Sequence, residues 1–224
     1  MSVAAVIVAA GSGTRYGDPD KVFALLGGRT VLARSIELFQ NIPECGDIVV
    51  VLGEHSLARG QQLIACCTDL RLTSCTGGAS RSDSVRAGLM ALRGDASLVA
   101  VHDAARPLAT PELVRRVLES ARMHGAAVPS LPVGDTVQEV DAEGALCAVL
   151  ERERLRAVQT PQIARRDWLL RALAGSSTAT DESTALHLAG FPVRHIAGEH
   201  GNIKLTWPSD LSLAEALLAA RAAS

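Results

Sequence analysis

Short apolar runs alternate with amphipathic stretches along most of the chain. The first run, residues 3–10, is continuously apolar and closes at Gly11, as in a buried parallel strand that enters a turn. Comparable runs predict further strands at residues 47–53, 70–74, 97–102, 126–129, 157–160 and 192–197. Apolar residues at helical spacing predict helices at residues 30–39, 56–66, 80–92, 110–124, 167–174, 181–189 and 209–220.

This order of elements predicts an α/β fold, a Rossmann-like, mostly parallel sheet with helices on both faces. The clearest helix start is at Thr110, which can cap the helix, followed by Pro111 in the first turn. Ligands of such sheets bind outside the carboxyl ends of the strands. The residues that directly follow strands are therefore the first candidates for a functional site.

The alternation breaks down after Pro132. Residues 136–140 and 145–150 flank a polar turn at 141–144, a pattern that predicts a β-hairpin. No neighbouring helix in the sequence covers this hairpin, and an isolated two-stranded ribbon is only marginally stable in water. We expect it to pack against the rest of the chain or against a second copy.

The composition is that of an ordinary globular protein and excludes several classes. Of 224 residues, 48% are hydrophobic and 21% are charged, with a net charge of −2, which excludes intrinsic disorder. Near-neutral charge and six aromatic residues argue against a nucleic-acid partner. The apolar run at 3–10 is too short for a membrane span, and no basic residue precedes it as in a signal peptide.

Cysteine and lysine usage add two observations. The 5 cysteines are an odd number without a Cys-x-x-Cys pair, which favours reduced thiols and a cytoplasmic location. Among 22 basic residues the only lysines are Lys21 and Lys204. These two positions are candidates for a role that needs a compact ammonium group rather than a guanidinium.

The first candidate site follows the first strand, in the sequence AAGSGTR at residues 9–15. Its glycine spacing matches neither the dinucleotide fingerprint nor the P-loop, so a tight turn without a ligand is one interpretation. The other is a loop whose backbone N–H groups approach phosphate oxygens. Arg15 and Lys21 favour the second, because two cations at the carboxyl end of a strand suit a polyphosphate.

Three further segments could carry chemistry. Asp103 and Arg106 follow the strand at 97–102, where a carboxylate beside phosphates commonly holds Mg²⁺ and an arginine pairs with a second anion. Glycines and serines at 77–84 open a helix and could bind a phosphate or a base edge. Lys204 lies in the segment 201–206. Each segment also has an interpretation without a ligand. Asp103 could be a helix cap beside a surface Arg106, residues 77–84 could be a plain helix cap, and Lys204 could be a solvated lysine.

Taken together, these segments resemble the 2-C-methyl-D-erythritol 4-phosphate cytidylyltransferase family. The resemblance covers nearly the whole chain through AAGSGTR with Lys21, GGASRSDSV at 77–85, HDAARP at 102–107, DT at 135–136, QTPQ at 159–162, TDE at 180–182 and GNIKLT at 201–206. It implies one nucleotidyltransferase domain over residues 1–224, of the nucleotide-diphospho-sugar transferase type. It also implies a protruding β-arm at about 133–156 that clasps a second subunit in a homodimer.

The resemblance further implies transfer of CMP from CTP to 2-C-methyl-D-erythritol 4-phosphate with release of pyrophosphate, a step towards isoprenoid precursors. The implied catalytic residues are Arg15, Lys21 and Lys204. The implied nucleotide-binding residues are Ala9, Ala10, Gly11, Gly13, Gly78, Ala79 and Ser84. The residues implied for the second substrate are Asp103, Arg106, Thr136, Arg152, Thr180 and Lys204, with Thr136 and Arg152 supplied by the partner's arm. Asp103 would also bind Mg²⁺ or another divalent cation.

Two positions depart from the family pattern, because Asp20 stands where relatives usually have proline and Ala79 stands where some carry a polar or acidic side chain. A contact between Ala79 and the base must therefore come from its backbone. Three other functions share part of this pattern. A cytidylyltransferase for another polyol phosphate, such as ribitol 5-phosphate, shares most motifs, and a nucleotide-binding regulator would lack turnover. A nicotinamide dehydrogenase is disfavoured by the glycine spacing.

Overall fold

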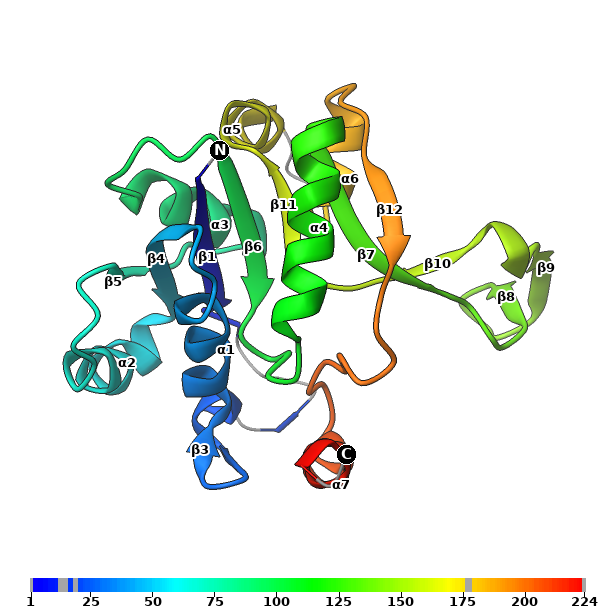
Figure 1. Ribbon diagram of the computed structural model, residues 1–224. Helices are drawn as coiled ribbons and strands as arrows, with labels where there is room; N and C mark the ends of the chain where they lie inside the picture. Colours follow the sequence, from blue (N-terminus) through cyan, green and yellow to red (C-terminus); the bar gives the residue numbers. More distant parts are fainter. Residues whose placement is uncertain (1, 12–15, 18–19, 176–178, 223–224) are drawn as a thin grey trace.

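The computed structural model describes residues 2–11, 16–17, 20–175 and 179–222. Its centre is an eight-stranded sheet in the order β10-β7-β11-β6-β1-β4-β5, with β12 paired to β7 (Figure 1). The strands are β1 (Val3–Ala9), β4 (Cys45–Leu52), β5 (Leu72–Thr76), β6 (Leu98–Asp103), β7 (Ala126–Pro132), β10 (Arg156–Val158), β11 (Gln162–Arg165) and β12 (Arg194–Ala197).

Strand β1 marks the point where the strand order reverses. It pairs in parallel with β4 on one side and with β6 on the other. The chain proceeds from β1 to β4 and β5 in one direction and then crosses back to β6. The carboxyl ends of β1 and β6, at Ala9 and Asp103, therefore meet where doubly wound sheets form their ligand crevices.

Strand β11 was not predicted from the sequence. It runs antiparallel between β6 and β7. It has only four residues and begins with the polar Gln162, so it is too short to show a periodic pattern. Strand β10 also pairs antiparallel with β7, at one edge of the sheet. The pairings β1–β4, β1–β6, β4–β5 and β7–β12 are parallel, and the predicted mostly parallel α/β fold is confirmed.

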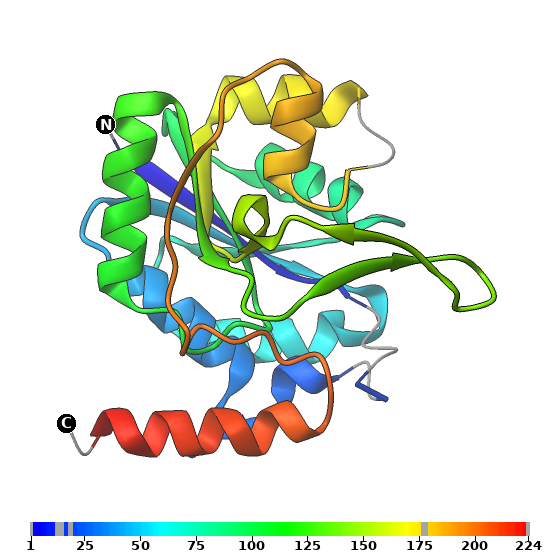
Figure 2. The same cartoon turned by 90° about the vertical axis from the view of Figure 1, so that its right-hand side faces the viewer.

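Helices cover both faces of the sheet because successive β1 side chains alternate between two apolar clusters. Ile7 packs in the cluster that includes α1 (Val31–Gln40) and α4 (Pro111–His124), with α2 (Leu57–Ala65) at its margin. Val6 packs in the cluster of α3 (Arg81–Ala91), α5 (Arg166–Gly175) and α6 (Glu182–Leu188). Figures 1 and 2 show these two helical layers on opposite sides of the sheet.

A third, smaller apolar cluster fixes the C-terminal helix beside the N-terminal loop region. Helix α7 (Ser209–Ala222) contributes Ala214, which packs with Leu26 of the short ribbon formed by β2 (Leu25–Leu26) and β3 (Arg29–Thr30). Leu205 belongs to the same cluster. This packing brings the segment before α7, which contains Lys204, next to the segment that contains Lys21.

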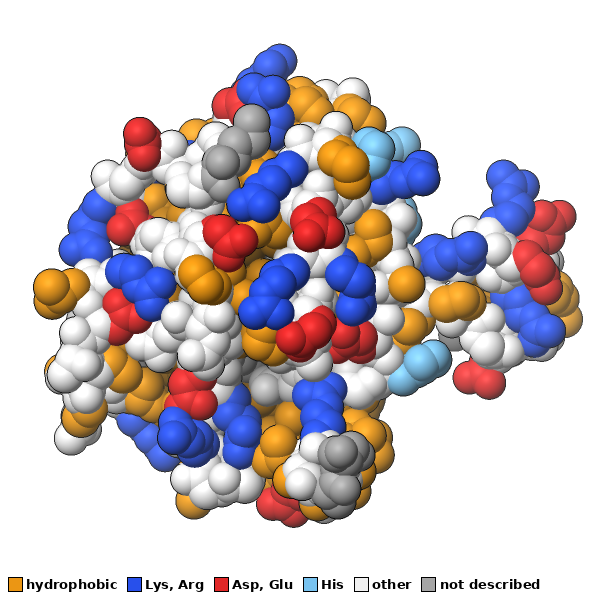
Figure 3. Space-filling model, in the orientation of Figure 1, with side chains coloured by type: hydrophobic (Ala, Val, Ile, Leu, Met, Phe, Trp, Pro, Cys, Tyr) orange, Lys and Arg blue, Asp and Glu red, His pale blue; other side chains and the backbone are white. Residues whose placement is uncertain are grey.

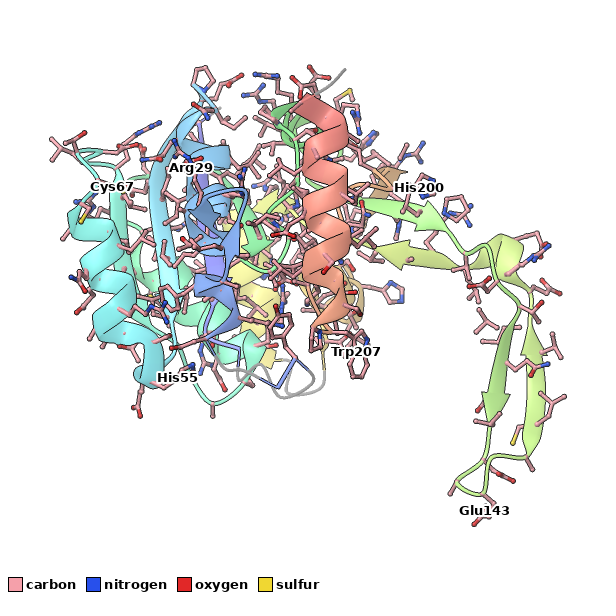
Figure 4. All side chains as sticks on the ribbon, turned by 90° about the horizontal axis from the view of Figure 1, so that it is seen from below. Arg29, His55, Cys67, Glu143, His200 and Trp207 are labelled. Atoms are coloured by element: carbon pink, nitrogen blue, oxygen red, sulfur yellow. The ribbon has the colours of Figure 1, made fainter. Side chains whose placement is uncertain are left out.

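The predicted hairpin forms a separate two-stranded antiparallel sheet. Strand β8 (Val137–Val140) pairs with β9 (Leu146–Leu150), and the hairpin extends away from the main sheet with Glu143 at its tip (Figures 1 and 4). Val140, Leu146 and Val149 are 54%, 57% and 60% exposed, respectively. Figure 3 shows charged and apolar side chains together on this projection, which we call the arm.

No helix in the described part of the chain is long and apolar enough to cross a membrane.

Candidate active site

A cavity of about 360 Å³ opens at the carboxyl ends of β1 and β6. It gathers residues from four candidate segments that lie far apart in the sequence. The site residues predicted from the sequence that line it are Ala9, Ala10, Gly11, Lys21, Gly78, Ala79, Ser84, Asp103 and Lys204. Gly13 and Arg15 lie outside the described residues. We refer to this cavity as the cleft.

Asp103, the last residue of β6, is the central charge of the cleft. Its Oδ1 accepts a hydrogen bond of 2.9 Å from Arg81 Nη2, and its Oδ2 accepts one of 2.6 Å from Lys204 Nζ. Asp103 is buried, at 7% exposure. Burial raises the pKa of Asp103, but Arg81 and Lys204 lower it further than burial raises it, so the pKa lies well below its usual range. Asp103 is therefore ionised at neutral pH.

Arg81 and Glu182 form a buried ion pair behind Asp103, and the sequence analysis assigned a role to neither. Arg81 begins α3 and donates from Nη1 and Nη2 to the two carboxylate oxygens of Glu182, at 2.6 and 3.1 Å. Glu182 begins α6 and is 1% exposed. Burial raises the pKa of Glu182, while the adjacent guanidinium opposes that change. Arg81 lies in the motif GGASRSDSV and Glu182 in the motif TDE. The two residues are 101 positions apart, and nothing in the sequence indicates that their side chains meet.

The two lysines of the chain reach the cleft from segments far apart in sequence. Lys21 Nζ donates a 3.0 Å hydrogen bond to the carbonyl of Leu205, the residue after Lys204. The same ammonium lies 5.8 Å from the centroid of the Tyr16 ring. The rarity of lysine in the sequence therefore pointed to two residues that the fold brings to one place.

The glycine-rich segment before α3 forms a tight wall of the cleft. Ser80 caps the helix, and a capping box links its hydroxyl and backbone to Asp83. The N–H of Gly78 donates to Ser84 Oγ at 3.2 Å. A Cβ on Gly78 would lie 2.4 Å from the Cβ of Asp83, so only glycine allows this close approach. Gly78 and Ala79 both line the cleft.

Arg106 is held by backbone carbonyls rather than lying free on the surface. Its Nη1 donates to the carbonyl of Asn202 at 2.8 Å, and its Nη2 donates to that of Val158 at 3.3 Å. Burial lowers the pKa of Arg106, an effect that Asp103 opposes. Arg106 does not line the cleft described above, so its contact with the second substrate stays a prediction.

The remaining predicted residues also lie outside the cleft of their own chain. Thr136 is exposed at the base of the arm, and Arg152 donates from Nη1 to the carbonyl of Gly134 at 2.9 Å. Thr180 is exposed just before α6. A site that uses the arm of a second subunit would require Thr136 and Arg152 to lie away from their own cleft, and this role stays a prediction.

A cleft with two ammonium groups and an ionised carboxylate, at the strand-order reversal of a mostly parallel sheet, defines a class of α/β protein that binds anionic nucleotides. Sequence comparison specifies the class further. The family model described as 2-C-methyl-D-erythritol 4-phosphate cytidylyltransferase matches residues 3–220. This chain belongs to that family, and the resemblance inferred from its motifs is confirmed.

Relatives and solved structures agree with this assignment. The chain is 43% identical over 218 residues to the 2-C-methyl-D-erythritol 4-phosphate cytidylyltransferase of Dehalococcoides mccartyi, covering 96% of each chain. It is 36% identical to the enzyme of that name from Thermus thermophilus, whose crystal structure superposes with a TM-score of 0.78 over 96% of this chain and 98% of that one. A synthase structure from Anaerococcus prevotii gives a TM-score of 0.83 at 27% identity, covering 97% and 98% of the two chains.

Proposed function

We propose that this protein transfers CMP from CTP to 2-C-methyl-D-erythritol 4-phosphate, forming 4-diphosphocytidyl-2-C-methyl-D-erythritol and pyrophosphate. The observation that carries the proposal is the convergence of Lys21, Lys204 and Asp103 on one cleft, in a chain that belongs to the family. This cleft provides the positive charge that a triphosphate requires and backbone groups that could contact the base.

The reaction requires no general base. A phosphate oxygen of the second substrate attacks the α-phosphorus of CTP in line, and the bond from that phosphorus to the pyrophosphate oxygen breaks. A phosphate monoester has a second pKa of about 6, so the nucleophile is largely dianionic at neutral pH. His102 lies next to Asp103 in sequence but cannot serve as a base, because it is fully buried and burial lowers its pKa to about 4.

The main barrier is electrostatic, because two anions must meet. Lys21 and Lys204 offset the repulsion and stabilise the negative charge that develops on the phosphorus oxygens and the leaving pyrophosphate. The hydrogen bond from Lys21 to Leu205 holds one ammonium group beside the segment that carries the other. Such fixed charges need little reorganisation during the reaction.

The donor set of the cleft fits a single divalent cation shared with the substrate. Asp103 is the only carboxylate among the described residues that line the cleft. No group of three His, Cys, Asp or Glu side chains within the described ranges could hold a metal unaided. Mg²⁺ commonly takes one or two carboxylates and completes its shell with phosphates and water. We propose that Asp103 holds Mg²⁺ with the triphosphate, where the ion would neutralise phosphate charge.

We also infer a cytoplasmic homodimer. The arm exposes Val140, Leu146 and Val149, and exposed apolar clusters of this kind are typical of interaction surfaces. Thr136 and Arg152, implied for the second substrate, lie at the base of the same arm. All five cysteines are free thiols, which agrees with a reducing compartment.

A substrate panel tests the proposed function. Purified protein is incubated with CTP and Mg²⁺ together with 2-C-methyl-D-erythritol 4-phosphate, ribitol 5-phosphate or no acceptor, and pyrophosphate release is measured. We expect release with methylerythritol phosphate at a kcat/KM at least tenfold above that with ribitol phosphate. Preference for ribitol phosphate would favour the other polyol phosphate, and CTP binding without any pyrophosphate release would favour a regulator.

A further inference from the structure

Four charged side chains of alternating sign form one continuous chain of hydrogen bonds behind and along the cleft. Glu182 accepts two bonds from Arg81, at 2.6 and 3.1 Å. Arg81 donates from Nη2 and Nε to Oδ1 of Asp103, at 2.9 and 3.2 Å. Lys204 donates to the other Asp103 oxygen at 2.6 Å. All three nitrogens of the Arg81 guanidinium are thus engaged by the two carboxylates.

Glu182 differs from the other three residues of this hydrogen-bonded series because it lies outside the cleft. Arg81, Asp103 and Lys204 line the cleft, whereas Glu182 is 1% exposed and lies on the far side of Arg81. It therefore cannot contact a substrate in the cleft directly. Any influence of Glu182 on the reaction must pass through the orientation of the guanidinium.

The position of Glu182 is itself fixed by the fold. Asp181 caps α6 by accepting the N–H of Thr184 at 2.8 Å, and it accepts the side-chain amide of Gln162 at 2.9 Å. Gln162 also accepts the N–H of Ser183 at 2.8 Å through its carbonyl oxygen. The start of α6 is thereby bonded to β11, next to β6, so Glu182 presents its carboxylate to Arg81 from a rigid support.

We propose that Glu182 is a positioning residue for cytidylyl transfer: it holds Arg81 by a two-oxygen contact, and Arg81 in turn fixes the orientation of the Asp103 carboxylate in the cleft. This inference rests on the proposed function. Without the Glu182 charge, Arg81 loses one of its two carboxylate partners, and its donors can turn towards Asp103 or into the cleft. Asp103 then no longer presents Oδ2 in the geometry that the structure shows.

The test is a mutant cycle measured by pyrophosphate release from CTP and 2-C-methyl-D-erythritol 4-phosphate. Glu182→Gln keeps the shape of the side chain but removes its charge and one acceptor. We expect kcat/KM to fall about 10–100-fold, the usual effect of losing a residue that orients a metal-binding side chain. In an Asp103→Asn background the same substitution should lower kcat/KM less than threefold, because the group it orients is already absent.

A matched control separates positioning from stability. Asp69 accepts two bonds from Arg71, at 3.0 and 2.7 Å, near the amino end of β5 and therefore at the opposite edge of the sheet from the cleft. Asp69→Asn removes a comparable arginine–carboxylate contact and should leave kcat/KM within twofold of the wild type. Thermal unfolding of all variants shows which are folded. If Glu182→Gln does not fold, Glu182→Asp, which keeps the charge at shorter reach, replaces it in the same cycle.

The outcomes distinguish this inference from the proposed function. Wild-type protein that releases no pyrophosphate contradicts the proposed function. Active wild-type protein with a folded Glu182 variant of unchanged kcat/KM contradicts the positioning role alone. An equal loss with and without the Asp103 carboxylate also contradicts it, because the effect would then bypass Asp103.

Discussion

Lys21 donates its ammonium hydrogen bond to the carbonyl of Leu205, 184 positions away and one residue after Lys204. This contact joins the short 3₁₀ helix Lys21–Phe23 to the segment that precedes α7. It places both lysines of the chain beside a cleft whose only described carboxylate is Asp103. The proposed reaction depends on this concentration of compact positive charge, and the first prediction removes part of it.

Lys21→Ala should lower kcat by about 100-fold or more, the scale seen when one preorganised donor to a transition-state charge is lost. Lys21→Arg should restore little activity, because a planar guanidinium does not place its charge where a compact ammonium does. Steady-state pyrophosphate release measures both variants. Turnover near the wild-type rate in the alanine variant would remove Lys21 from the mechanism.

Mixed dimers test whether the arm completes the partner's site. Lys21→Ala and Arg152→Ala subunits are inactive separately in this account, but a heterodimer would contain one site with both residues intact. Subunit exchange should therefore restore activity to about a quarter of the wild-type level, from statistical mixing of a two-fold symmetric dimer. No recovery, with exchange verified by tagged subunits, would show that each site is built from one chain.

The apolar side chains of the arm should stabilise the dimer. Val140 and Leu146 are cross-strand neighbours and are both more than half exposed. Leu146→Asp should weaken self-association about 10–100-fold, since burial of one leucine contributes about 1.5–3 kcal/mol. Sedimentation velocity across a concentration series measures this change. Glu143→Gln at the tip is the control and should sediment as the wild type does, whereas unaltered association of the Leu146 variant would place the interface elsewhere.

His102 should make the fold less stable in mild acid. It is fully buried, and burial lowers its pKa to about 4 from an ordinary value of 6.5. As the pH falls below 6.5 the unfolded chain gains a proton that the folded chain does not, so stability decreases until the pH reaches the folded pKa. Between pH 7 and pH 4.5 this amounts to about 2 kcal/mol.

Urea unfolding in a chelating buffer measures that loss. The low pKa of Asp103 does not interfere, because a depressed carboxyl pKa costs stability only below its ordinary value of about 3.8. His102→Gln should show a flatter dependence of unfolding free energy on pH over the same interval. The same dependence of unfolding free energy on pH in the wild type and in folded His102→Gln would mean that His102 becomes protonated without cost.

Local chemistry made some elements predictable from the sequence and left others hidden. Helix α4 begins where the Thr110–Pro111 signal placed it, with Thr110 Oγ1 accepting the N–H of Leu113 at 3.0 Å. Such caps involve residues three apart, so the sequence contains the whole interaction. Strand β11 was missed because its place between β6 and β7 depends on long-range pairing, which four residues cannot encode by periodicity.

Some residues of the site could likewise be predicted from the sequence, and others could not. Gly11, Asp103 and Lys204 line the cleft and could be predicted as site residues, because each follows a strand or stands out as a rare residue type. The Arg81–Glu182 contact could not, because both side chains have ordinary local interpretations as first-turn residues of helices. Their pairing arises only when α3 and α6 pack on the same face of the sheet.

We propose that the cleft between Lys21 and Asp103 holds the triphosphate of CTP, and a crystal structure of the protein with CTP and Mg²⁺ tests this most directly. We expect the triphosphate to lie within direct or metal-bridged contact of Lys21 and Asp103, with the base against the backbone of Gly78 and Ala79. Well-defined CTP bound away from these residues would contradict it.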